Sequence, residues 1–126
     1  MKLLIITQYF DPENLPINFV SRLLSQSNIE VDVITGKPNY PEGKFYKSFG
    51  FFSRIHYKLN HNTLGSVYRV PILPRGSKSF RGLKLALNYI SFVISASIIP
   101  FFYMGSHYTN NRRIICLYDL KKYIIR

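Results

Sequence analysis

The order of apolar segments in the first 35 residues constrains the fold more than any other feature of this sequence. "KLLIIT" (2–7) is a continuous apolar run of strand length, which is typical of a buried parallel strand. Segment 19–27 then carries apolar residues at helical spacing, and "IEVDVIT" (29–35) alternates apolar with acidic residues, as a strand does. Strand, helix and strand in this order predict a βαβ unit with a right-handed crossover.

The helix of this unit is predicted to start at an N-cap and to carry one apolar stripe. Asn18 is the expected cap, because its side chain can accept a hydrogen bond from a free amide of the first turn. The apolar stripe consists of Phe19, Val20, Leu23 and Leu24. Arg22 and Gln26 lie on the opposite side of the helix. We expect the apolar stripe to face the sheet.

Three later segments extend the prediction to an α/β domain with a mostly parallel sheet and flanking helices. Residues 66–73 and 112–120 are strand candidates, and the polar stretch before residue 66 is expected to form turns. Segment 83–104 is long and apolar, with no charge from residue 85 onward, and Pro100 is expected to break or kink it. It is either a helix buried in the domain, a helix in the membrane interface, or a membrane span.

Length and cysteine content narrow the class of protein. A chain of 126 residues suffices for one domain. Its single cysteine, Cys116, excludes an internal disulfide framework and a cysteine zinc site, which fits a reducing compartment. We expect the N-terminal apolar run to be a strand and not a signal peptide, because Gln8, Asp11 and Glu13 follow it too early.

The positive charge of the chain is concentrated in its middle. Residues 1–35 have a net charge of −2, residues 36–84 of +9 and residues 85–126 of +4, which gives +11 in total. Such a segment favours an anionic partner, such as a diphosphate or an acidic membrane, although a solvated basic face would have the same composition. Nucleic acid is not expected, because no RNP, zinc-finger or helix-turn-helix pattern is present.

Few motifs in the chain carry chemistry by themselves. The first glycine is Gly36, so no glycine-rich phosphate loop follows the first strand. His56 and His61 have no carboxylate nearby in the sequence, and no metal site is expected. Asp11 and Glu13 lie in the loop after the first strand, where open parallel sheets bind ligands, and each is either a site residue or a surface acid.

One loop, "TGKPNYPEGKFYKSFGFF" (35–52), is more specific than these motifs, because it combines prolines and glycines with alternating lysines and aromatic rings. Together with "KLLIITQYFDPEN", "YRVPILPRG" and "LKLALNYISFVISAS", it resembles the start of family-4 glycosyltransferases of the GT-B fold. The nearest branch is that of colanic-acid and O-antigen synthesis, which includes the fucosamine transferases. The resemblance covers residues 1–97 and implies an incomplete Rossmann-like N-terminal domain.

This resemblance implies the transfer of a sugar from a nucleotide-sugar donor to a lipid-linked polyprenyl-diphosphate acceptor. Such enzymes serve cell-surface polysaccharide synthesis, which includes O-antigen (lipopolysaccharide), capsule and colanic acid. The implied location is the cytoplasm, peripherally on the inner face of the plasma membrane, and no cofactor or metal is expected. The alternative is a non-catalytic, basic protein that binds the membrane interface.

The resemblance also implies two groups of site residues, while the catalytic residues stay unassigned. Candidates for the acceptor side of the cleft are Gln8, Tyr9, Phe10, Glu13, Asn14, Asn18, Lys37, Asn39, Tyr40 and Lys44. Candidates for contact with an anion or a membrane are Lys47, Arg69, Arg75, Lys78 and Arg81.

The last 29 residues (98–126) diverge from the family pattern. The change in composition is what a shifted reading frame or a premature stop would produce, so we expect the donor-binding C-terminal domain to be absent. Because transfer requires donor and acceptor in one cleft, the chain by itself is expected to lack transferase activity.

Overall fold

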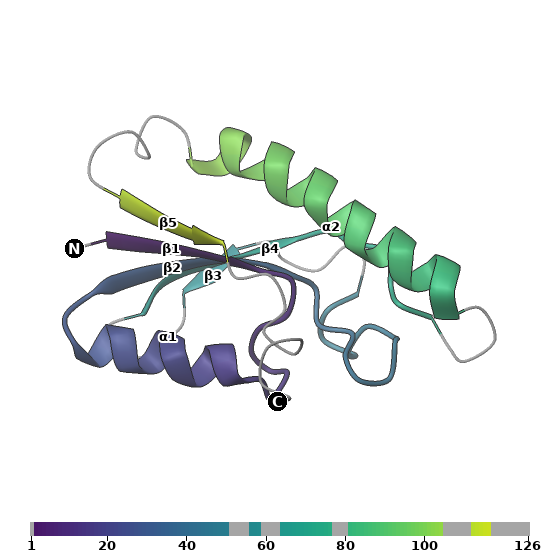
Figure 1. The fold of residues 1–126 in the computed structure, drawn as a ribbon, viewed down its shortest axis with the longest axis horizontal. Coiled ribbons are helices and arrows are strands. Elements are labelled where there is room, and N and C mark those ends of the chain that lie inside the picture. The colour runs from purple at the N-terminus through teal and green to yellow at the C-terminus, as the bar shows by residue number, and fades with distance from the viewer. Residues whose placement is uncertain (1, 51–55, 59–63, 77–80, 105–111, 117–126) are drawn as a thin grey trace, which may run out of the picture.

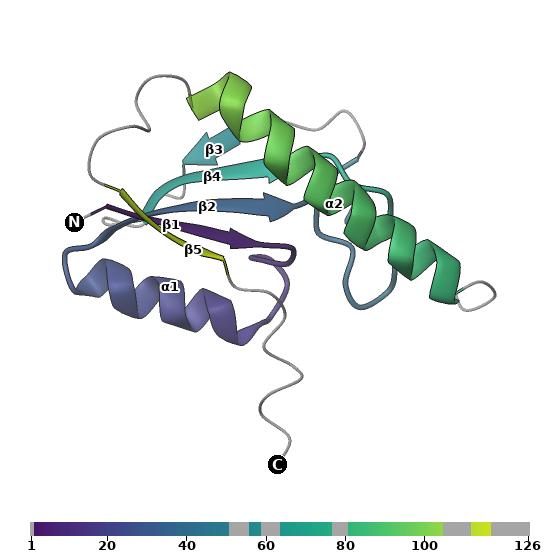
Figure 2. The ribbon, with the colours of Figure 1, turned by 45° about the horizontal axis from the view of Figure 1, so that its top comes forward.

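The computed structural model describes residues 2–50, 56–58, 64–76, 81–104 and 112–116. These residues form one mixed sheet with strand order β3-β4-β2-β1-β5, together with two helices (Figure 2). The elements in chain order are β1 (Lys2–Thr7), α1 (Pro16–Gln26), β2 (Glu30–Gly36), β3 (His56–Lys58), β4 (Leu64–Val70), α2 (Arg81–Met104) and β5 (Arg112–Cys116).

The predicted βαβ unit is confirmed, since β1 and β2 are parallel neighbours joined through α1. The pairs β1–β5 and β2–β4 are parallel too, so the α/β class with a mostly parallel sheet is correct and compatible with a partial Rossmann-like fold. The strand predicted at 112–120 is β5, and its residues 117–120 lie outside the described part of the chain. Strand β3, antiparallel to β4, was not expected in the polar segment before residue 66.

The two helices cover opposite faces of the sheet, as Figure 1 shows. Alternate residues of each strand point to opposite faces, so the sheet has two apolar cores. The core on the α1 side contains Leu3, Ile5, Phe10, Ile17, Val31, Val33 and Val67. The core on the α2 side contains Leu4, Ile34, Val70, Ile72 and Phe92. A strand buried on both faces has no polar face, which explains the continuous apolar run of β1.

Helix α1 corrects two expectations from the sequence. It begins at Pro16, with Leu15 in the N-cap position and no side-chain cap, because proline at the first helical position needs no amide partner. Asn18 therefore lies inside the first turn. The buried residues of the helix are Ile17, Ser21 and Ser25.

The predicted stripe of α1 is largely solvent-exposed instead of buried. Phe19, Val20 and Leu23 are exposed, and Leu24 alone of the four packs against the core. The small side chains of Ser21 and Ser25 let the helix approach the sheet closely. Their hydroxyls donate to the helix carbonyls of Asn18 and Ser21 at 2.9 Å, so burying them leaves no donor unsatisfied.

Helix α2 continues through Pro100 to Met104, so of the expected break or kink at this proline the break does not occur. Its inner face contributes Asn88 and Phe92, which are buried against the sheet. The opposite face carries exposed apolar side chains at Leu83, Leu87, Ile90, Val93, Ile94 and Ile98. Of the helices in the described part of the chain, none is long and apolar enough to cross a membrane.

Candidate functional site

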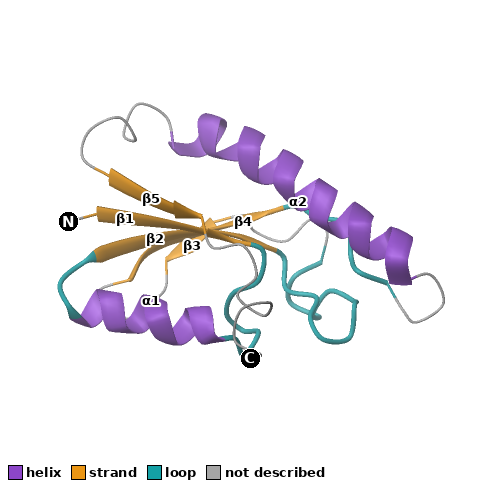
Figure 3. Cartoon of the chain, in the orientation of Figure 1, coloured by secondary structure: helices purple, strands orange, loops and turns teal. Residues whose placement is uncertain are grey.

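The loops that follow β1, β2 and β4 meet at one end of the sheet, as Figure 3 shows in teal. They meet there because parallel strands end at the same edge. Two backbone hydrogen bonds join them. The amide of Gly36 donates to the carbonyl of Gln8 at 3.1 Å, and the amide of Gly76 donates to the carbonyl of Gly43 at 3.0 Å. This end of the sheet is the candidate site.

Glu13 holds the first two of these loops together from the inside. Its side chain is buried, and Oε1 accepts the backbone amides of Asn39 and Tyr40, both at 2.7 Å. Burial raises the pKa of this carboxyl above its ordinary value, although the two amides and the nearby Arg69 guanidinium act in the opposite direction. Glu13 is therefore a buried anchor and not a surface acid.

Two asparagines predicted for the cleft also act on the loop backbones. Asn18 Nδ2 donates to the carbonyl of Glu13 at 2.7 Å, which connects α1 to the loop after β1. Asn39 is fully buried, and its Nδ2 donates to the carbonyl of Lys37 at 3.0 Å. Both side chains fix the local shape of the site by satisfying buried backbone oxygens.

Two cations among the candidates, one from each group, are buried within the loops. Arg69 donates to the carbonyls of Gly36 (3.1 Å) and Asp11, and its guanidinium carbon lies 4.7 Å from the ring centroid of Phe49. Lys37 Nζ donates to the carbonyl of Gly50 at 2.8 Å, and burial lowers the pKa of this lysine. Arg69 was a candidate for contact with an anion or a membrane, and the structure encloses its side chain fully, so its charge is not presented at the surface.

An aromatic and cationic cluster of Tyr9, Tyr40 and Arg75 lies nearer the surface, with one residue from each loop. The rings of Tyr9 and Tyr40 have centroids 5.9 Å apart and are tilted by 50°. The guanidinium carbon of Arg75 lies 5.7 Å from the Tyr9 centroid and 5.4 Å from the Tyr40 centroid. All three side chains are half-buried, so the cluster combines apolar ring surface with a partly desolvated charge.

Asn88 on α2 supports this cluster through hydrogen bonds, and the sequence analysis did not identify this residue as part of the site. Its Oδ1 accepts from Gln8 Nε2 at 2.6 Å and from the Tyr9 hydroxyl at 3.3 Å, while its Nδ2 donates to the carbonyl of Leu73. Burial also raises the pKa of Tyr9, while Arg75 opposes that rise. An asparagine within a charge-free apolar helix was the available signal, since buried amides require hydrogen-bond partners.

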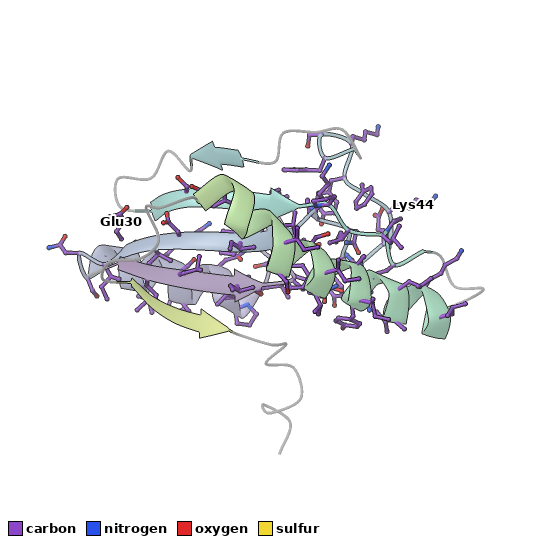
Figure 4. All side chains as sticks on the ribbon, turned by 90° about the horizontal axis from the view of Figure 1, so that it is seen from above. Glu30 and Lys44 are labelled. Carbon is purple, nitrogen blue, oxygen red and sulfur yellow. The ribbon has the colours of Figure 1, made fainter. Side chains whose placement is uncertain are left out.

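The remaining candidates are scattered. Phe10 is part of the hydrophobic core, and Asn14 is exposed. Lys44 and Lys47 are exposed on the loop after β2, and Figure 4 shows Lys44 at the end of the molecule opposite Glu30. Arg81 is the first residue of α2, and Lys78 lies outside the described residues.

Comparisons with models of protein families, with curated proteins and with solved structures gave no match to this chain. Within the described ranges, no group of three or more His, Cys, Asp or Glu side chains could hold a metal ion. The class defined by the fold is thus an α/β domain with a mostly parallel sheet and a loop site at the carboxyl edge of its strands.

Proposed function

We propose that this chain forms the acceptor side of a GT-B glycosyltransferase. The enzyme would transfer a sugar from a nucleotide-sugar donor to a polyprenyl-diphosphate-linked saccharide in cell-surface polysaccharide synthesis. The observation that carries the proposal is the pair of tyrosine rings, Tyr9 and Tyr40, at the carboxyl edge of a parallel sheet. This edge is where open α/β sheets bind ligands.

The chemistry of the site suits a saccharide. The ring faces of Tyr9 and Tyr40 offer apolar surface for the C–H groups of a sugar, and polar groups at the rim can fix its hydroxyls. Glu13 and Asn88 hold the two rings in place through the Tyr40 amide and the Tyr9 hydroxyl. Because this framework is already ordered, a ligand would lose little free energy in arranging it.

In the proposed reaction this domain positions the acceptor, while a second domain of the GT-B fold binds the donor. Holding both reactants in one cleft converts a bimolecular step into an effectively unimolecular one. Glu13 is assigned an anchoring role and no reacting role, because its carboxylate is buried beneath the loops.

A second candidate role, binding to an anionic membrane, is favoured by the outer face of α2. Leu83, Leu87, Ile90 and Ile94 recur at helical spacing and are exposed, and the adjacent Lys84 is exposed as well. An apolar helical face with basic residues beside it binds the interface of anionic bilayers. This role is compatible with the first, since a lipid-linked acceptor lies at the membrane.

The proposed function is tested by acceptor binding. The ligand is a short-chain, water-soluble prenyl-diphosphate saccharide, and binding is measured by saturation-transfer NMR. We expect signals on the sugar protons with the wild type and a loss of these signals with Tyr40→Ala. The matched control is Phe19→Ala, which removes an exposed aromatic ring from α1 that takes no part in the Tyr9–Tyr40–Arg75 cluster. Equal signals with Tyr40→Ala and wild type would contradict the proposal.

A further inference from the structure

We infer that Arg75 forms an oxyanion-binding site that takes the phosphoryl group of a ligand whose sugar lies on Tyr9 and Tyr40. The sugar part of this inference rests on the proposed function, whereas the phosphoryl part rests on Arg75 alone. The chemical class is a phosphate ester or diphosphate, and its source is either a soluble sugar phosphate or the headgroup of a lipid.

The contacts of Arg75 differ from those of the other cations at the site. Arg69 and Lys37 are buried, and each donates to loop carbonyls. Within the part of the chain that the structure describes, Arg75 contacts the two tyrosine rings and has no hydrogen bond or ion pair to a protein group. Its five N–H donors are therefore available to a ligand.

The two ring contacts also leave the hydrogen-bonding groups of Arg75 for a ligand. Rings attract the guanidinium by its charge and leave its N–H groups, which lie in the guanidinium plane, unsatisfied. A planar fork of this kind matches the spacing of two phosphate oxygens and binds them in a bidentate manner. Because Arg75 is half-buried, its attraction for an anion is screened less than that of the exposed Lys44 or Lys47.

The backbone that carries Arg75 is fixed on both sides. Before it, the Leu73 amide donates to Ser91 Oγ at 2.9 Å, and the Leu73 carbonyl accepts from Asn88 Nδ2. After it, the Gly76 amide donates to the Gly43 carbonyl at 3.0 Å. A cation on a fixed segment loses less conformational entropy on binding than one on a free loop, and this favours Arg75 as the specific contact.

The test measures phosphate binding and its location together. Inorganic pyrophosphate, glucose 1-phosphate and vesicles of phosphatidylglycerol are added separately to the whole chain, and ring resonances of Tyr9 and Tyr40 are followed by NMR. We expect the soluble phosphates to shift both rings. Arg75→Lys, which keeps the charge but loses the fork, should weaken binding about tenfold. The control Lys47→Gln should change it less than about twofold.

The arms of this experiment separate the possible outcomes. Shifts of both rings with vesicles alone identify a lipid headgroup as the source, and shifts with soluble phosphates identify a sugar phosphate. Unchanged affinity in both Arg75→Lys and Arg75→Ala overturns the inference, even if the prenyl-diphosphate saccharide still binds. Phosphate binding through Arg75 without any saccharide binding retains the oxyanion site and rejects the proposed function.

Discussion

Gly43 and Gly76 join the loop after β2 to the loop after β4 by a backbone hydrogen bond of 3.0 Å from the Gly76 amide to the Gly43 carbonyl. Both residues have φ in the left-handed region, at 79° and 74°, where a side chain is strained. The contact is so close that a Cβ on Gly43 would overlap the carbonyl oxygen of Gly76. Glycine at both positions is therefore required for this junction, which lies beside Arg75.

Gly43→Ala should lower the free energy of unfolding by roughly 1–3 kcal/mol, because strain in φ adds to a backbone clash. The matched control is Gly50→Ala, since a Cβ there meets no atom within 4 Å and no positive φ is involved. Urea unfolding followed by circular dichroism measures both variants. Equal stability of the two variants would show that the junction does not hold the loops together.

Glu13→Gln should change how stability depends on pH. The folded-state pKa of Glu13 lies above the ordinary value of 4.5. The native protein therefore holds the proton of the Glu13 carboxyl more tightly than the unfolded chain does. The stability that the protonated Glu13 carboxyl contributes is fully present below pH 4.5, and it is lost as the pH rises through the raised pKa. Glutamine keeps an oxygen to accept the amides of Asn39 and Tyr40, and it has no proton to lose.

We therefore expect the wild type to lose more stability than Glu13→Gln between about pH 4 and pH 8. The measurement is a series of urea unfolding curves across this range. Parallel pH profiles for the two proteins would mean that burial does not govern the ionisation of Glu13.

Asn88→Leu should destabilise the domain and disturb the site together. The substitution removes the partners of Gln8, Tyr9 and Leu73 at once, and the loss of each of these part-buried hydrogen bonds costs about 0.5–1.5 kcal/mol. The Tyr9 ring resonances should shift as well. Ser97→Ala is the control on the same helix, because its exposed hydroxyl donates to the carbonyl of Val93, away from the cluster. A variant as stable as the control, with unchanged Tyr9 resonances, would exclude Asn88 as the support of the cluster.

Ile90→Glu combined with Ile94→Glu should weaken sedimentation with anionic vesicles while leaving stability nearly unchanged, because both side chains are exposed. The matched control is Phe19→Glu with Val20→Glu on α1. It adds the same two negative charges at exposed apolar positions, but on the other face of the sheet. If both double variants lose binding equally, net charge and not the α2 face controls membrane association.

The order of strands and helices in this domain is predicted well from the sequence, because the apolar patterns of the central strands are clear. The apolar run of β1 and the alternation in β2 identify two central strands, because β1 packs against a helix on each face. The face of α1 was predicted wrongly, because the two serines that bury there count as polar by type. Their hydroxyls bond within the helix, and this lets them replace apolar residues in the interface.

The candidate site was predictable in part. The resemblance implied Tyr9, Glu13 and Tyr40 as residues of the acceptor cleft and put Arg75 in a separate group of anion or membrane contacts. The structure brings Tyr9, Tyr40 and Arg75 into contact at one edge of the sheet. Which of the charged residues are buried could not be predicted, because Arg69, Lys37 and Glu13 are enclosed by loop carbonyls and amides far apart in the sequence. Asn88 was missed for the same reason, since its partners lie 79 and 80 positions away.

The most direct test of the proposed acceptor site is a binding titration of the soluble prenyl-diphosphate saccharide against the wild type, Tyr40→Ala and Phe19→Ala. The proposal predicts saturable binding by the wild type and Phe19→Ala, and at least a tenfold loss with Tyr40→Ala, on the order of 1.4 kcal/mol. No saturable binding by the folded wild-type chain, or equal binding by all three proteins, would contradict the assignment of this loop cluster as a saccharide-acceptor site.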